Sequence, residues 1–199
     1  MNTDSLKIII VNNYSQGSFT DRIDRLKEII NSSFLDIDLS VVSFQQFNND
    51  LVKKCDGVIL TGSSLNVSSF YHNWRLKKYF RPILNFLVKN ESIPVFGICF
   101  GFHLVAYAYG VHVCRMTIRE RPSKVIFIHF EPKDKLVPEE NIPVNVNHRD
   151  YLHPNDINLQ DQFDIFSTSN VREYQIVQFI RHKRKPIIAS QFHPETHQL

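Results

Sequence analysis

Hydrophobic residues in the first half of the chain occur either in short continuous runs or at helical spacing. Short runs rich in Ile, Val and Leu predict buried strands, and they cover residues 7–11, 38–44, 57–60 and 94–98. Apolar residues three or four positions apart predict helices at residues 20–34, 74–89 and 100–109. Pro82 is expected to kink the second helix or to begin a new one. Strands that alternate with helices in this way are typical of an α/β sheet.

The pattern changes after Gly110, where helical spacing is scarce and strand-like runs predominate. The predicted strands cover residues 111–116, 123–130, 144–146, 163–168, 174–181 and 187–192. We expect them to add antiparallel strands to the sheet, which gives an open mixed α/β sheet with helices on both faces. Because no linker rich in Gly, Ser or Pro interrupts the chain, residues 1–199 are predicted to form a single domain.

Charge and cysteine content narrow the possible functions only slightly. The chain has 23 Lys and Arg against 20 Asp and Glu, a net charge of +3, which is too small to indicate nucleic acid or a membrane surface as a partner. Its three cysteines are too few and too scattered for a disulfide framework or a metal site. No apolar run approaches the roughly 18 residues that span a bilayer, and no signal-peptide pattern is present. We therefore expect a cytoplasmic protein without a metal or cofactor.

Cys99 stands at the centre of the sharpest chemical motif, Gly-Ile-Cys-Phe-Gly at residues 97–101. A predicted strand ends directly before this cysteine and a predicted helix begins directly after it. Glycines on both sides allow the tight strand-to-helix turn that exposes a nucleophile, and the helix N-terminus favours a thiolate. A buried structural cysteine would also fit so short a motif, so the motif alone leaves both interpretations open.

A candidate base and its orienting group follow in Gln-Phe-His-Pro-Glu at residues 191–195. His193 stands at the end of a predicted strand, and Pro194 fixes the backbone so that Glu195 can turn back toward the imidazole. A carboxylate on one ring nitrogen leaves the other free to face a thiol. A surface His and Glu is the alternative, because the chain contains nine histidines. The pairing with Glu195, rather than the histidine itself, favours the catalytic interpretation.

These two motifs in this order resemble the class I glutamine amidotransferases. The resemblance spans nearly the whole chain and implies a flavodoxin-like form of the open mixed sheet. It also implies that Cys99 attacks the side-chain amide of L-glutamine to form a γ-glutamyl thioester, that His193 is the acid and base, and that Glu195 orients the histidine. Further likeness between residues 61 and 74 is to stand-alone proteins similar to the amidotransferase part of guanosine monophosphate synthetase.

An oxyanion hole typically needs two backbone amides. The resemblance assigns one to Phe100, which follows the nucleophile, and the other to Ser63, in a loop that usually reads Ser-Gly-Gly-Pro. The corresponding segment here is Thr-Gly-Ser-Ser at residues 61–64, so Ser63 replaces a glycine and Gly62 is a candidate substrate-binding residue. An ordinary turn is the alternative for this loop.

The predicted substrate-binding residues lie in two further places. Asn147, His148, Arg149 and Asp150 match a segment that lines the glutamine pocket in the family, and Arg149 and Asp150 carry the charges that an α-amino acid requires. A plain loop is the alternative. His103 occupies a position where the family usually has glutamine, and an imidazole cannot reproduce the hydrogen bonds of an amide.

The leading interpretation is a glutaminase that hydrolyses L-glutamine to glutamate and ammonia. The chain lacks a Walker-type phosphate loop, so the ammonia is expected to reach a separate synthetase subunit or to be released. A γ-glutamyl hydrolase with the same triad and an inactive regulatory module remain open alternatives. Four residues follow Glu195, whereas the family usually continues into a closing helix, so an apolar flank of the first strand is expected to be uncovered or to meet a partner.

Overall fold

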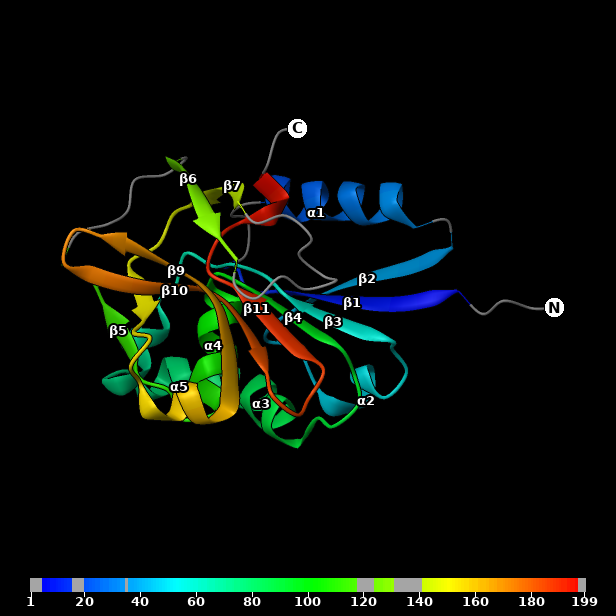
Figure 1. Cartoon of the computed structure of the whole chain (residues 1–199). Coiled ribbons are helices and arrows are strands. Elements are labelled where there is room, and N and C mark those ends of the chain that lie inside the picture. The colour runs from blue at the N-terminus through cyan, green and yellow to red at the C-terminus, as the bar shows by residue number, and fades with distance from the viewer. Residues whose placement is uncertain (1–4, 16–19, 35, 118–123, 131–140, 197–199) are drawn as a thin grey trace.

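A seven-stranded mixed sheet forms the centre of the protein in a computed structural model, which describes residues 5–15, 20–34, 36–117, 124–130 and 141–196 (Figure 1). The strand order is β2-β1-β3-β4-β11-β10-β9. The first five of these strands run parallel, and β10 and β9 are antiparallel to their neighbours. The strands are β1 Leu6–Asn12, β2 Ile37–Ser43, β3 Gly57–Leu60, β4 Val95–Ile98, β9 Phe163–Val171, β10 Tyr174–His182 and β11 Ile187–Ser190.

Helices cover both faces of the sheet, as the sequence predicts. Helix α1 lies on one face, and α3 and α4 lie on the other (Figure 1). Alternating residues of β1 serve the two layers: Ile10 packs toward α1, and its neighbours Ile9 and Val11 pack toward α3 and α4. The helical segments are α1 Thr20–Ser33, α2 Asn49–Val52, α3 Trp74–Lys89, α4 Phe100–Ala108, α5 Ile157–Gln162 and the 3₁₀ helices η1 Val67–Tyr71 and η2 Pro194–Thr196.

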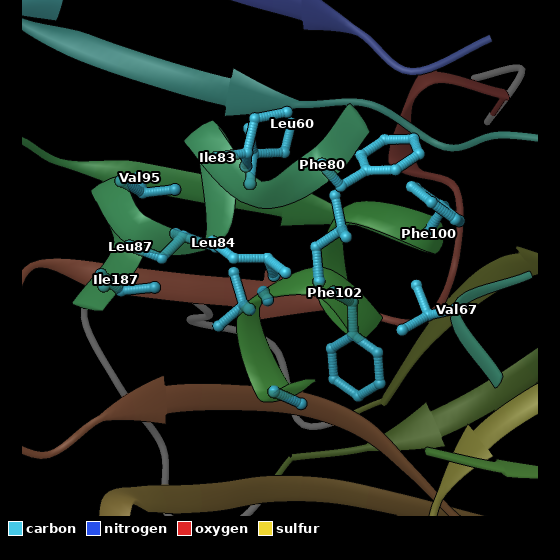
Figure 2. Close-up of a cluster of buried hydrophobic side chains, with 14 of the residues drawn as sticks. Leu60, Val67, Phe80, Ile83, Leu84, Leu87, Val95, Phe100, Phe102 and Ile187 are labelled. Atoms are coloured by element: carbon cyan, nitrogen blue, oxygen red, sulfur yellow. The ribbon is translucent and has the colours of Figure 1, made fainter. Parts of the chain in front are cut away.

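The core beneath α3 and α4 is rich in aromatic residues and fixes α4 against the sheet. Phe80 of α3 and Phe100 of α4 pack with their ring centroids 5.1 Å apart. Leu60 of β3 and Val95 of β4 cover the same cluster from the sheet (Figure 2). Each of these side chains is at most 2% exposed. The start of α4 is therefore held firmly at the end of β4.

The C-terminal half differs from the sequence prediction in its strand pairing. Only β9, β10 and β11 join the main sheet, and β11 is parallel to β4 rather than antiparallel. The other strands form separate antiparallel pairs, β5 Val113–Arg115 with β8 Asp150–Leu152 and β6 Lys124–His129 with β7 Asn141–Val146. A strand as short as β8 carries too few alternations to stand out in a sequence.

The structure also bears on two helical features. Of the two outcomes expected at Pro82, a new helix is excluded, because α3 is one helix through this residue; the exposed proline costs it one backbone hydrogen bond. The short helix α5 was not predicted, although Asp156 caps it by accepting a hydrogen bond from the Leu159 amide at 3.0 Å.

An apolar hollow of about 470 Å³ lies beside β1 and α1, lined by residues such as Ile8, Phe96 and Ile188. Among the described residues, no helix combines the length and the apolar character needed to cross a membrane.

Candidate active site

Cys99 occupies the tight turn between β4 and α4. Its φ of 51° and ψ of −95° lie where a non-glycine residue is strained, and among the described residues only Arg172 shares a positive φ without being glycine. The turn depends on a close approach of α4 to β3, because a Cβ at Gly101 would collide with the carbonyl oxygen of Leu60. The Cys99 amide donates to the Ser190 carbonyl at 2.8 Å, which ties the turn to the end of β11.

His193 and Glu195 form a buried pair just after β11. The Nδ1 of His193 lies 2.7 Å from Oε1 of Glu195, and the two residues are 3% and 4% exposed. Burial lowers the pKa of His193, but attraction and hydrogen bonding to the thiolate of Cys99, together with Glu195, outweigh it and raise the pKa to about 9. The imidazole is therefore positively charged at neutral pH when it faces a thiolate.

Arg22 and Tyr14 lie against this pair, although no sequence pattern indicates either residue. Nη1 of Arg22 lies 2.9 Å from Nδ1 of His193, 3.4 Å from the Tyr14 hydroxyl and 3.9 Å from Oε1 of Glu195. Burial raises the pKa of Tyr14, so its hydroxyl stays protonated. A Cβ at Gly62 would lie 2.7 Å from the Tyr14 hydroxyl and 3.0 Å from Cε1 of His193, so Gly62 gives these groups space.

Side chains from the end of β1 hold the loop that contains Ser63. Nδ2 of Asn13 donates to the Thr61 carbonyl at 2.8 Å, and Oγ of Ser63 donates to the Asn13 carbonyl at 2.7 Å. No hydrogen bond of the Ser63 backbone amide is found within the described residues. The Phe100 amide, at the first position of α4, also has no partner within its own helix. Both amides are thus available as donors.

A cavity of about 260 Å³ opens above Cys99 and gathers most of the predicted binding residues. The lining includes these residues that the sequence predicts for the site: Ser63, Cys99, Phe100, His103, Asn147, His148, Arg149 and Asp150. Gly62, His193 and Glu195 are not part of this lining. The described residues contain no cluster of three or more His, Cys, Asp or Glu side chains that could hold a metal ion.

The charged groups of the cavity differ in how firmly they are held. The buried carboxylate of Asp150 accepts from the Ser68 amide at 2.8 Å and from the Ser68 hydroxyl at 2.7 Å. Arg149 is exposed, and so is Arg115, which lines the same cavity and was not predicted. Oδ1 of Asn147 is buried and has no hydrogen-bond partner in the described part of the chain. The cavity therefore presents a fixed carboxylate, two cations and an unused acceptor.

His103 contacts Gln191 beside the nucleophile. The Nε2 of His103 lies 2.7 Å from Oε1 of Gln191, and Nε2 of Gln191 lies 3.8 Å from Sγ of Cys99. Burial lowers the pKa of His103 to about 4, so the ring is neutral at physiological pH. Gln191 belongs to the motif around His193, but no sequence pattern indicated that its side chain contacts His103 and Cys99.

The glutamine amidotransferase class-I family matches residues 18–198. A subunit of the glutamine-hydrolyzing GMP synthase of Thermoplasma acidophilum is 31% identical over 96% of this chain and 84% of that protein. The corresponding protein of Methanococcus aeolicus is 36% identical, but the match covers only about half of each protein, 53% of this chain and 53% of the relative.

Solved structures show the same fold. A putative GMP synthase subunit from Thermoplasma acidophilum superimposes with a TM-score of 0.74 and 25% identity, over 97% of this chain and 86% of that one. The glutaminase domain of Trypanosoma brucei CTPS, with bound acivicin, superimposes with a TM-score of 0.69 over 98% of this chain and 88% of that one. At 13% identity the second likeness concerns the fold alone. By sequence and by fold, this chain belongs to the glutamine amidotransferase class-I family.

Proposed function

We propose that the protein hydrolyses the side-chain amide of L-glutamine through the triad Cys99, His193 and Glu195. One observation carries this proposal: a cysteine on a strained strand-to-helix turn opens into a cavity and interacts with a buried, carboxylate-bound histidine. The alternative of a surface His and Glu does not fit side chains that are 3% and 4% exposed. The strained turn and the cavity above it support a reactive cysteine rather than a buried inert thiol.

In the first half of the reaction, the thiolate of Cys99 attacks the side-chain amide carbon of glutamine. The carbonyl oxygen becomes an oxyanion, and the free amides of Phe100 and Ser63 are its proposed donors. His193 is charged beside the thiolate, so it holds the proton that the departing nitrogen needs. As the C–N bond breaks, ammonia leaves and a γ-glutamyl thioester remains on Cys99.

In the second half, a water molecule replaces ammonia. Neutral His193 removes a proton from the water, which attacks the thioester carbon. The C–S bond then breaks, glutamate leaves, and the thiolate and the charged imidazole are restored. Throughout, Glu195 is the proposed acceptor of the hydrogen bond from Nδ1 of His193. Nε2, which lies 3.2 Å from Nη1 of Arg22, is the nitrogen proposed to exchange protons with the reacting atoms.

The cavity supplies groups suited to the two ends of an α-amino acid. The fixed carboxylate of Asp150 can accept a hydrogen bond from the substrate ammonium group, because two bonds from Ser68 leave part of its acceptor capacity unused. Arg149 can pair with the substrate carboxylate. The proposed substrate-binding residues also include Asn147, His148 and His103, which line the cavity. Gly62 completes the set, because its lack of a side chain leaves space for His193.

We further propose that residues 1–199 act as one amidotransferase domain and deliver ammonia to a separate synthetase subunit. The support comes from the matched relatives, which are named as subunits of glutamine-hydrolyzing GMP synthases. A protein that supplies ammonia in this way is expected to work inside the cytoplasm, where a synthetase and glutamine are available.

The test is glutamate release from L-glutamine by the purified protein, alone and with a candidate synthetase subunit. C99A should lose all activity, while C114A, which alters another free and partly buried thiol, should retain it. Faster turnover of γ-glutamyl dipeptides than of glutamine would refute the glutaminase assignment. Full activity of C99A would refute the proposed nucleophile.

A further inference from the structure

Gln191 links the first turn of α4 to the sulfur of Cys99. It follows β11 directly, is fully buried, and its backbone amide donates to the Gln178 carbonyl at 2.9 Å. Its side-chain oxygen lies 2.7 Å from Nε2 of His103, and its side-chain nitrogen lies 3.8 Å from Sγ of Cys99. The carboxamide therefore bridges an imidazole and the proposed nucleophile.

Hydrogen-bond chemistry determines which of the two side chains, His103 or Gln191, donates the proton. A neutral imidazole has one donor nitrogen and one acceptor nitrogen, and a carbonyl oxygen can only accept. Nε2 of His103 must therefore carry the proton and donate to Oε1 of Gln191. With that oxygen engaged by His103, the NH₂ group of Gln191 faces the sulfur of Cys99.

The opposite orientation of the amide would be unfavourable for catalysis. Turning the carboxamide over would place its NH₂ group against the proton of His103 and its oxygen against Cys99. An oxygen lone pair facing a thiolate is repulsive, whereas an N–H group facing a thiolate stabilises the negative charge. With its proton on Nε2, His103 favours the amide orientation in which the N–H group of Gln191 faces the sulfur.

We propose that His103 is a positioning residue, which holds the carboxamide of Gln191 so that its N–H group donates to the thiolate of Cys99. This inference rests on the proposed function only in taking Cys99 as the nucleophile. His103 lines the cavity as well, but its donor nitrogen is directed at Gln191 rather than at a substrate.

The experiment is the pH dependence of Cys99 alkylation by iodoacetamide, followed by mass spectrometry of the Cys99 peptide. Q191M removes the donor at similar side-chain length and should move the midpoint of the rate profile upward by about one pH unit, a tenfold loss of thiolate at a fixed low pH. H103M frees the amide to turn over and should move it in the same direction. H103Q supplies another N–H donor and should restore the midpoint of the parent protein.

Other titratable groups are unchanged in these variants. These groups include His193 and Tyr14, whose pKa values are raised in part by the charge of Cys99, and Glu195, which lies beside both. Thermal unfolding would verify that each variant is folded before alkylation. Loosened packing alone would expose the buried sulfur of Cys99 to water and move the midpoint downward, opposite to the shift expected from loss of the donor.

The outcomes separate this inference from the proposed function. An unchanged midpoint in Q191M would overturn the donor role of Gln191. An unchanged midpoint in H103M, or a failure of H103Q to restore the parent value, would overturn the positioning role of His103. Because alkylation requires no glutamine, a parent protein without glutaminase activity would count against the proposed function and leave this test intact.

Discussion

Protonation of His103 should destabilise the protein as the pH falls below neutrality. In the folded state, burial lowers the pKa of His103 to about 4, against an ordinary value of 6.5 for the unfolded chain. Between these two values the unfolded chain binds more protons than the folded protein does. The free energy of unfolding must therefore decrease as the pH falls from 6.5 toward 4.

The size of this effect follows from the two pKa values. A separation from 6.5 to about 4 corresponds to about 3 kcal/mol of unfolding free energy when the whole window is crossed. Between pH 7 and pH 5, which leaves only the acid end of the window uncrossed, the loss is about 2 kcal/mol. A change of this size is a large fraction of the stability of an ordinary domain.

His193 has the opposite sign and a different window. Its folded pKa of about 9 is above the ordinary value of 6.5, so its stabilising contribution is fully present below 6.5 and is lost as the pH rises toward 9. Acidification from pH 7 to pH 5 therefore strengthens the contribution of His193 while it weakens that of His103. Burial also lowers the pKa of His182, so the contribution of His103 is measured as the difference between the parent protein and a variant without this histidine.

The assay is urea unfolding of the parent protein and H103Q at pH 7 and at pH 5. The glutamine side chain does not titrate, so the stability difference between the two proteins should shift by about 2 kcal/mol in favour of H103Q on acidification. H72Q, at an exposed position, is the matched control and should follow the parent at both pH values. A difference between parent and H103Q that is the same at pH 7 and pH 5 would refute the reasoning.

Two other substitutions test the packing around the site. G101A should destabilise the protein by about 1–3 kcal/mol in urea unfolding, because its Cβ would collide with backbone and side-chain atoms of Leu60; a variant as stable as the parent would contradict the close approach of α4 to β3. S68A removes one of two hydrogen bonds to the buried carboxylate of Asp150 and should cost about 1.5–3 kcal/mol in the same assay. S69A is its control, and equal effects at the two serines would argue against a specific bond.

The sequence could predict the first half of the fold because each element there carries its own signal. Continuous apolar runs such as Gly57–Leu60 are buried on both faces of a parallel sheet, and Trp74–Lys89 shows a clear helical period. The strand-to-helix turn at Cys99 was also predictable, since flanking glycines mark it locally. Strand partners in the second half were not, because no local pattern shows that β5 pairs with the distant β8, or that β6 and β7 pair with each other instead of joining the main sheet.

In the candidate site too, contacts between sequence neighbours were predictable and contacts between distant residues were not. His193 and Glu195 stand two residues apart, so one motif indicated their contact. Arg22 lies 171 residues from His193 in sequence, and the two meet because α1 packs against η2, the 3₁₀ helix that follows His193. No periodic pattern or short motif in α1 indicates that contact. Such partners become visible only when the sheet has brought the ends of its parallel strands to one edge.

His103 illustrates what a sequence position leaves undetermined. Its place one turn after the nucleophile led to the prediction that it binds substrate, and the structure places it in the lining of the cavity. Its single donor is directed at Gln191, so toward a substrate the neutral ring retains only an acceptor at Nδ1. An amide in the same position would offer two donors as well as an acceptor. If the proposed hydrogen bond to Gln191 holds, His103 can only accept hydrogen bonds from a substrate, and an amide in its place would not be limited in this way.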